Sequence, residues 1–262
     1  MGTEKKEQVI KRIVRLFNKN VKGKKPNTSS SNLGHDGKAG HWLENQMRIT
    51  HNANNAPDLW GFEMKNHTTS KTTFGDWSAD YYIFKDQKYF LKNKGTKNRD
   101  KFMEIFGAPN SKRNNRYAWS GKPTPKIGSY NEFGQKLIID KQNNIIAVYS
   151  FKSDKRKNKK KIIPLTMRKD DLILAKWRAQ IIALKVENKF NKSGWFKCIE
   201  NTKTGVYSHI VFGGPINFKS WINGVKKGFI FFDSGMHVGN NRPYSNWRAN
   251  NKYWDSLVIG KY

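Results

Sequence analysis

The segment NAPDLWGFEMK, residues 55–65, decides which fold is expected for this chain. From residue 60 on, apolar and other side chains alternate, with Trp60, Phe62 and Met64 set against Gly61, Glu63 and Lys65. Because successive side chains of a strand point to opposite faces, this alternation predicts a strand with one apolar face and one polar face. Asp58 lies at the turn that enters the strand, so it can bring a second carboxylate toward the polar face.

Two carboxylates beside a backbone carbonyl suit a hard divalent cation, which prefers oxygen ligands. Asp58, Glu63 and the carbonyl of Met64 can supply part of a ligand shell, with water and phosphate oxygens completing it. Such a cation lowers the pKa of its bound water and stabilises charge on a phosphoryl group. Lys65 can orient the attacking water or stabilise that charge. The pattern indicates phosphodiester hydrolysis, and the alternative is an exposed strand whose Glu63 and Lys65 only pair as neighbours.

A third acid precedes this segment. Glu44 lies fourteen residues before Asp58, in a short helix expected over residues 39–48. Its carboxylate can contact the water shell of the cation or Lys65, and the alternative is a surface carboxylate that faces solvent. The candidate catalytic residues are therefore Glu44, Asp58, Glu63 and Lys65.

The net charge indicates the class of partner. The 262 residues include 50 Lys and Arg against 20 Asp and Glu, a formal net charge of +30, and 13% are aromatic. The aromatic content allows a buried core despite the high charge. A field this positive attracts polyanions, among which nucleic acids are the common cytosolic ones. Charge does not separate an enzyme from a noncatalytic DNA- or RNA-binding protein, so both hypotheses stay open.

Several classes of protein are excluded by what the chain lacks. A single cysteine, Cys198, excludes an intramolecular disulfide framework and Cys-based zinc fingers, and it fits a reducing cytosol. The N-terminal residues have no apolar signal region, and no segment approaches the run of about eighteen apolar residues that spans a membrane. The motifs of metalloproteases, P-loop NTPases and dinucleotide-binding domains are absent from the sequence.

The remainder of the chain mixes helical and strand patterns, which predicts an α/β or α+β fold. The expected helices cover residues 4–17, 39–48, 100–106, 170–179 and 217–226. The expected strands cover residues 81–85, 181–188, 194–200 and 228–233, with a hairpin over 137–151 that turns near Asn143. The basic residues 18–38 and 152–161 are expected to be solvated loops that can contact phosphate.

The C-terminal segment 234–248 is rich in side chains that suit base edges. Arginine pairs with guanine, asparagine with adenine, and histidine serves as donor or acceptor. The candidate DNA-binding residues of this segment are His237, Asn240, Arg242 and Arg248. Arg113 and Arg116 belong to a second basic and aromatic cluster, for which phosphate contact or simple packing is favoured over base readout. An ordinary polar loop is the alternative for residues 234–248.

The segments GHWLENQ (residues 40–46), APD (56–58) and FEMK (62–65) together resemble the PD-(D/E)xK nucleases. The resemblance is to the branch that contains the restriction endonucleases MvaI and BcnI and the mismatch-repair nickase MutH. It rests on a Glu, a fourteen-residue step, an Asp, four residues and then Glu-x-Lys. The resemblance implies a mixed central sheet flanked by helices. It also implies two lobes that enclose DNA in a cleft, a catalytic lobe over about residues 1–135 and a recognition lobe over about residues 136–262.

The resemblance also implies an activity. The implied enzyme is a Mg²⁺-dependent type II restriction endonuclease that cuts a short specific site in double-stranded DNA. Asp58 and Glu63 would be the metal ligands, Lys65 the catalytic lysine and Glu44 the supporting acid. A MutH-like DNA-nicking repair endonuclease is the alternative within the branch. A monomeric protein, a cognate DNA methyltransferase as functional partner, and the bacterial cytoplasm as location are also expected from the resemblance.

Overall fold

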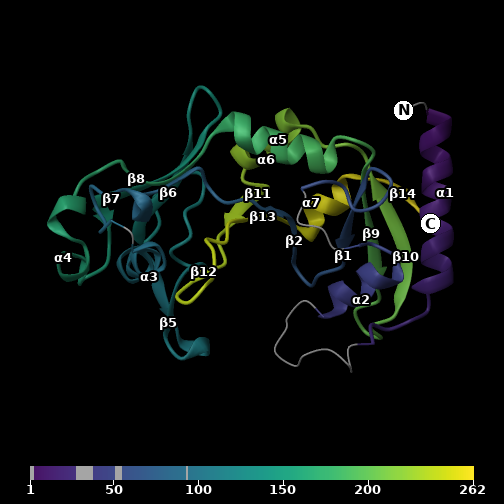
Figure 1. Ribbon diagram of the computed structural model, residues 1–262, viewed down its shortest axis with the longest axis horizontal. Coiled ribbons are helices and arrows are strands. Elements are labelled where there is room, and N and C mark those ends of the chain that lie inside the picture. Colours follow the sequence, from purple (N-terminus) through teal and green to yellow (C-terminus); the bar gives the residue numbers. More distant parts are fainter. Residues whose placement is uncertain (1–2, 28–37, 51–54, 93) are drawn as a thin grey trace. The chain divides into compact units, whose positions relative to one another are not determined.

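The computed structural model describes residues 3–27, 38–50, 55–92 and 94–262 (Figure 1). The chain divides into two compact units, each assembled from segments distant in sequence. Unit 1 comprises Met1–Thr72, Leu184–Phe218 and Asn250–Tyr262, and unit 2 comprises Thr73–Ala183 and Lys219–Ala249. The boundary expected near residue 135 does not coincide with this division, because the chain leaves unit 1 and returns to it twice.

Unit 1 is built on a four-stranded mixed sheet. Its strand order is β1 (Phe62–Asn66), β9 (Gly194–Glu200), β10 (Tyr207–Gly213) and β14 (Val258–Lys261). The edge strand β1 pairs in parallel with β9, with Phe62 opposite Gly194, and the other two pairings are antiparallel. The parallel pairing joins residues more than a hundred positions apart in sequence, and the larger segment of unit 2, Thr73–Ala183, lies between them.

Two helices cover the apolar face of this sheet. In α1 (Thr3–Asn20), Ile13 and Phe17 are four residues apart, so they lie on one face and are fully buried. They share a core with Leu43 of α2 (Lys38–Gln46) and with Phe62 and Met64 of β1. Figure 1 shows α1 running beside this sheet. The helices expected over residues 4–17 and 39–48 and the apolar face of β1 are confirmed.

Unit 2 contains most of the remaining strands and helices. Its antiparallel sheet has the order β3 (Tyr81–Tyr82), β8 (Leu172–Trp177), β7 (Ile145–Asp154) and β6 (Phe133–Ile139). A smaller sheet consists of β12 (Met236–His237), β5 (Arg116–Trp119) and β4 (Ala108–Asn110), and a third of β11 (Ile230–Asp233), β13 (Asn246–Asn250) and β2 (Lys71–Asp76). The helices are α3 (Gly95–Phe106), α4 (Lys159–Ile162) and α6 (Phe218–Lys226), while α5 (Ala179–Phe190) crosses the division and α7 (Asn251–Ser256) belongs to unit 1.

The expected order of elements between residues 170 and 190 is wrong. The structure has a strand, β8, where a helix was expected, and a helix, α5, where a strand was expected. The burial of α5 explains the difference, since Ile182, Val186 and Phe190 are buried at four-residue spacing, which is helical. The strand expected over residues 81–85 is also shorter, because Ile83–Lys85 form a 3-10 helix.

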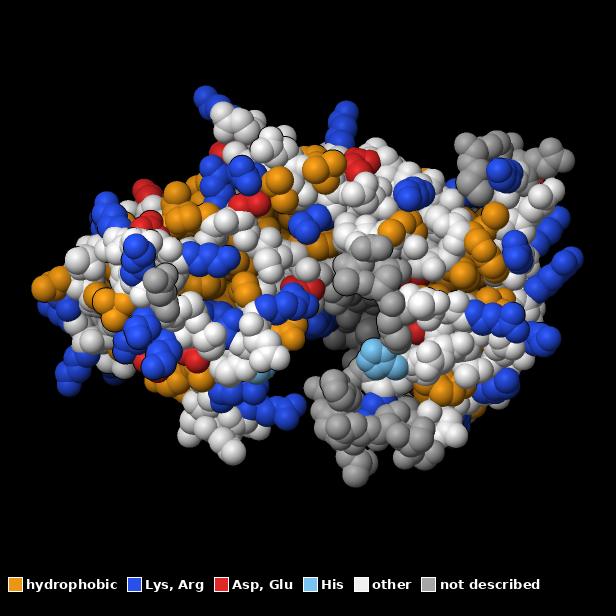
Figure 2. All heavy atoms as spheres, in the orientation of Figure 1, with side chains coloured by type: hydrophobic (Ala, Val, Ile, Leu, Met, Phe, Trp, Pro, Cys, Tyr) orange, Lys and Arg blue, Asp and Glu red, His pale blue; other side chains and the backbone are white. Residues whose placement is uncertain are grey.

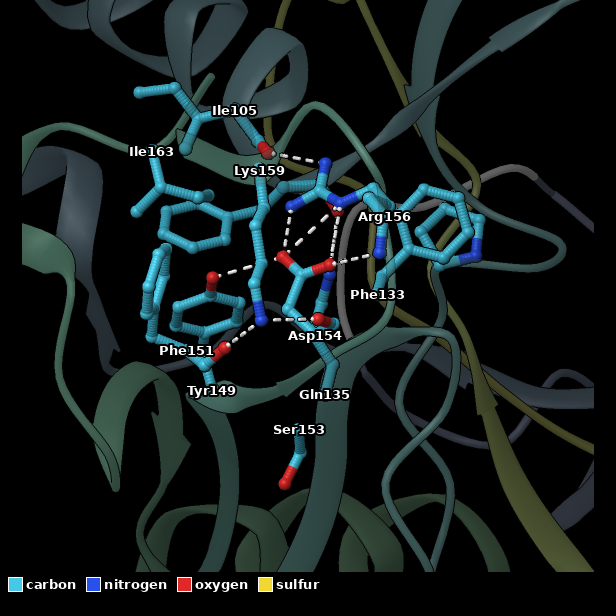
Figure 3. Close-up of polar contacts among 12 residues, drawn as sticks. Ile105, Phe133, Gln135, Tyr149, Phe151, Ser153, Asp154, Arg156, Lys159 and Ile163 are labelled. Carbon is cyan, nitrogen blue, oxygen red and sulfur yellow. Dashed lines mark hydrogen bonds and ion pairs between the residues drawn. The ribbon is translucent and has the colours of Figure 1, made fainter. Parts of the chain in front are cut away.

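The Lys-rich residues 152–161 are not simply a solvated loop. Strand β7 continues to Asp154, whose side chain is fully buried and forms an ion pair with Arg156 at 2.7 Å (Figure 3). The Tyr149 hydroxyl donates to the same carboxylate at 2.9 Å, and Arg156 also donates to the Ile105 carbonyl at 2.9 Å. Asp154 and Arg156 therefore link the end of β7 to α3 within unit 2. In the other basic segment, 18–38, residues 28–37 lie outside the described residues.

Lys and Arg side chains are spread over the surface of both units on the face drawn in Figure 2, with few carboxylates among them. Within the described residues no helix is long and apolar enough to cross a membrane.

Candidate active site

A two-residue turn leads the chain into β1. Leu59 and Phe62 exchange two backbone hydrogen bonds of 2.9 Å, and the residues between them, Trp60 and Gly61, have φ angles of 47° and 87°. Positive φ at both central positions is the mark of a type I′ hairpin turn. The Gly61 carbonyl accepts from the Ser193 amide at 3.0 Å, which ties the turn to the start of β9. Trp60 therefore belongs to the turn, so the alternation was wrong in placing it in the strand.

The turn returns Asp58 to the free edge of β1. Its Oδ2 accepts a hydrogen bond from the Met64 amide at 2.9 Å. Since the N–H and C=O of one residue lie on the same side of a strand, the Met64 carbonyl also faces this edge, away from β9. The Asp58 carboxylate and the Met64 carbonyl therefore lie on the same side of β1.

Glu63 and Lys65 lie on the face of β1 opposite the apolar core, and this polar face is buried. Lys65 Nζ is 2.8 Å from Glu63 Oε1, and the two side chains are only 10% and 3% exposed. A second amine, Lys189 Nζ, lies 3.1 Å from the same oxygen. The other oxygen, Glu63 Oε2, is buried and has no hydrogen-bond partner in the described part of the chain. Glu63 therefore has one saturated oxygen and one that is open to a further ligand.

The burial of the cluster changes how its groups bind protons. Burial, followed by the nearby charge of Glu63, raises the pKa of Asp58 to about 6, although Lys65 and Lys189 oppose the rise. Burial lowers the pKa of Lys65, and the adjacent Glu63 opposes this shift. Strongly shifted groups next to each other in a buried cluster are typical of functional sites.

The donor set fits a hard divalent cation. The described residues contain no group of three or more His, Cys, Asp or Glu side chains arranged around a metal position. Mg²⁺, however, is commonly held by one or two carboxylates, with water and substrate phosphates completing its shell. Two oxygen donors suit such a cation. One is Glu63 Oε2, which is buried and has no partner among the described residues. The other is the Asp58 carboxylate, whose negative charge is disfavoured by burial and by the charge of Glu63, so a bound cation would stabilise it.

Two lysines of the site were missed by the sequence analysis. Lys189 lies in the last turn of α5, which had been expected to be a strand. Lys197 of β9 is directly opposite Lys65 in the parallel register, so its side chain is on the same face of the sheet. Lys197 is buried and donates to Asn251 Oδ1 at 3.2 Å, and burial lowers its pKa. The helical spacing in α5 was a usable signal for Lys189, but no local signal pointed to Lys197.

Glu44 lies on α2, where its carboxylate is 3.4 Å from His41 Nδ1 and its side chain is 32% exposed. The largest influences on the pKa of Asp58 are burial, neighbouring charges and a backbone hydrogen bond, and Glu44 is not among them. The structure thus brings Asp58, Glu63 and Lys65 together, while the role of Glu44 stays a prediction.

The candidate DNA-binding residues lie in unit 2. Strand β12 pairs with β5 so that His237 is opposite Ala118, two residues along β5 from the exposed Arg116. Arg113, also exposed, is in the short 3-10 helix Ser111–Arg113 that precedes β5. The small sheet therefore brings the two clusters that were separate in sequence into one neighbourhood.

The remaining candidates of the C-terminal segment have protein partners. Asn240 is buried, its side chain accepts from the His237 amide at 2.6 Å, and its amide nitrogen is 2.9 Å from the His237 ring. Arg242 pairs with Asp76 at 2.7 Å, and Arg248 is 3.3 Å from Asp233. Asn240 holds the loop in shape here, and base reading by these residues stays a prediction.

Comparison with known proteins decides the family. The model of the LlaMI restriction endonuclease family matches residues 21–262, which include the whole candidate active site. The chain belongs to the LlaMI restriction endonuclease family. Members of a restriction endonuclease family cut DNA at specific sequences, so site-specific DNA cleavage is the activity of this chain.

The LlaMI-family chain is 46% identical over 261 residues to the type II restriction enzyme ScrFI of Lactococcus lactis subsp. cremoris. The match covers 94% of this chain and 96% of ScrFI. Its fold is similar to that of the restriction endonuclease MvaI in a complex with its cognate DNA substrate, with a TM-score of 0.58 and 14% identity over 100% and 99% of the two chains. The resemblance to MvaI and the mixed α/β, PD-(D/E)xK class of fold are confirmed.

Proposed function

We propose that this chain is a Mg²⁺-dependent type II restriction endonuclease that hydrolyses phosphodiester bonds in a short specific sequence of double-stranded DNA. One observation carries the assignment of the site. In a chain of this family, Asp58, Glu63 and Lys65 converge in a buried cluster in which Glu63 Oε2 has no hydrogen-bond partner among the described residues. Asp58, Glu63 and the Met64 carbonyl would hold the cation. When bound, Mg²⁺ lowers the pKa of a coordinated water and neutralises charge on the phosphoryl oxygens.

The residues of the chain have separate roles in this proposal. Lys65, with its lowered pKa, orients the attacking water and exchanges a proton more readily than an exposed lysine would. Lys189 holds the Glu63 carboxylate in a fixed direction through Oε1, so that Oε2 remains available to the cation. Lys197, opposite Lys65 on the same face, adds positive charge where the DNA phosphate approaches. Glu44 supports the water shell from α2.

The test is cleavage of unmethylated plasmid DNA with Mg²⁺, followed by mapping of the ends. Lys65→Ala should bind DNA but not cut it, whereas Lys203→Ala, which removes an exposed lysine of unit 1, should cut normally. EDTA should stop cleavage by the unaltered chain. Undiminished Mg²⁺-dependent cleavage by Lys65→Ala would remove the proposed mechanism, even though the family assignment would stand.

The proposal includes how the protein acts in the cell. The chain acts as a monomer that cuts one strand at a time, in the bacterial cytoplasm, alongside a DNA methyltransferase that protects the same sequence. His237, Asn240, Arg242 and Arg248 would read bases, and Arg113 and Arg116 would contact phosphates. Sedimentation of the DNA complex tests the monomeric state, and a search for a nicked intermediate tests cleavage of one strand at a time. A dimeric complex that cuts without a nicked intermediate would contradict both points.

A further inference from the structure

A cationic pocket lies on unit 1 beside the turn that enters β1. It has a volume of about 440 Å³ and is lined by Arg12, Arg15 and Lys19 of α1, Arg48 after α2, and Leu59 and Trp60 of the turn. A volume of this order accommodates a small ligand or a segment of a larger one. Four cationic side chains therefore converge on one concave surface.

The four cations of the pocket are not paired with acids of the described residues. None of the four forms an ion pair within the described part of the chain, and no described acid lines the pocket. The contrast is with Lys11 on the same helix, which pairs with Glu7 at 3.5 Å. Like charges three or four residues apart on a helix repel one another, as Arg12, Arg15 and Lys19 do. Bound anions would relieve this repulsion, so the chemistry of the pocket fits phosphate.

The geometry around Trp60 adds an independent observation. Its φ of 47° is in the left-handed region, which disfavours residues with a Cβ, and type I′ turns usually have Asn, Asp or Gly there. The indole is nevertheless 38% exposed, and the Arg12 guanidinium lies 4.3 Å from its ring centre. An arginine stacked on an aromatic ring keeps its N–H groups available at the edge, already oriented for two-pronged contact with a phosphate.

We propose that this pocket binds backbone phosphates of duplex DNA outside the sequence that is recognised. The turn that lines the pocket connects Asp58 to Glu63, but α1, which supplies three of the cations, covers the face of the sheet opposite Glu63 and Lys65, so phosphates bound in the pocket would lie away from the bond that is cleaved. The proposal rests on the proposed function only in taking DNA as the ligand. Three of the four cations precede residue 21, where the match to the family model begins, while Arg48, Leu59 and Trp60 lie within it.

The test is the salt dependence of binding to a duplex of arbitrary sequence, measured by fluorescence anisotropy in EDTA. Arg12→Gln/Arg15→Gln removes two pocket charges, and Lys5→Gln/Lys11→Gln removes two exposed charges from the same helix outside the pocket. Each lost phosphate contact lowers the slope of log K against log salt by about 0.9. The pocket variant should therefore bind with a slope about 1.8 smaller, while the control keeps the original slope.

Equal changes of slope in both variants, or none in either, would overturn the proposal. Inorganic pyrophosphate, titrated by calorimetry, distinguishes a small phosphate ligand from DNA. Pyrophosphate binding that needs Arg12, together with an unchanged DNA slope, would also overturn it. Circular dichroism melting of both variants checks that they fold. Because no metal is present, the measurement does not depend on cleavage, so failure of the catalytic proposal and failure of this one give different results.

Discussion

Asp58→Asn should stabilise the protein in the absence of metal, although it should abolish cleavage. The pKa of Asp58 is raised from 3.8 to about 6. A raised carboxyl pKa in the folded state means that ionisation costs stability, and the loss develops as the pH rises from about 4 to about 6. With 1.36 kcal/mol for each pKa unit, the difference of about 2.2 units corresponds to about 3 kcal/mol above pH 6. Asparagine has no charge to lose there and can still accept from the Met64 amide.

The assay is urea unfolding in EDTA at several pH values between 4 and 8. The Asp58→Asn variant should match the unaltered chain at pH 4 and exceed it above pH 6, and Glu7→Gln, at an exposed site of unit 1, should show no such trend. Added Mg²⁺ should stabilise only the chain that keeps Asp58, because a ligand that binds the folded state shifts the unfolding equilibrium. A stability difference that is the same at pH 4 and pH 8 would refute the reasoning.

Three further changes test other parts of the structure. Lys189→Met removes the amine that lies 3.1 Å from Glu63 Oε1 and holds that carboxylate in place, so the Mg²⁺ concentration for half-maximal cleavage should rise; an unchanged concentration would contradict the orienting role of Lys189. Gly61→Ala places a Cβ at a residue whose φ is 87°, 2.8 Å from the Ser193 hydroxyl. Gly23→Ala is the matched control, because its φ of 78° is similar but nothing lies within 4 Å of the new Cβ. Calorimetric melting should show a loss of stability of roughly 1–2 kcal/mol for Gly23→Ala and a larger loss for Gly61→Ala. Asp154→Asn breaks a buried ion pair and should cost about 3–5 kcal/mol in urea unfolding, against less than about 1 for Glu104→Gln in an exposed pair.

The candidate site was partly accessible from the sequence because its central residues are local. Glu63 and Lys65 are two residues apart on a strand, and that spacing alone places them on one face. Asp58 is joined to Glu63 by a short turn, so its approach was also predictable. The burial of the polar face was not, since it depends on α5 and β9, which are distant in sequence.

The same distinction applies to the fold. Elements whose period was clear, such as α1, α2, α6 and β9, were predicted close to their observed bounds. Residues 170–190 were misassigned because short apolar runs fit both a strand and a helix, and position between two neighbouring strands decides which forms. The resemblance to the MvaI branch implied a division near residue 135, whereas the compact units are discontinuous.

The carboxylates, the lysine and the net positive charge were already visible in the sequence and indicated the kind of chemistry. Tertiary structure alone decided how that chemistry is tuned. It placed Lys189 and Lys197 beside the site, left Glu63 Oε2 without a partner among the described residues, and raised the pKa of Asp58. The physical reason is that spacing along a strand is a local property, whereas desolvation and charge interactions depend on every group that the fold brings near, whatever its position in the chain.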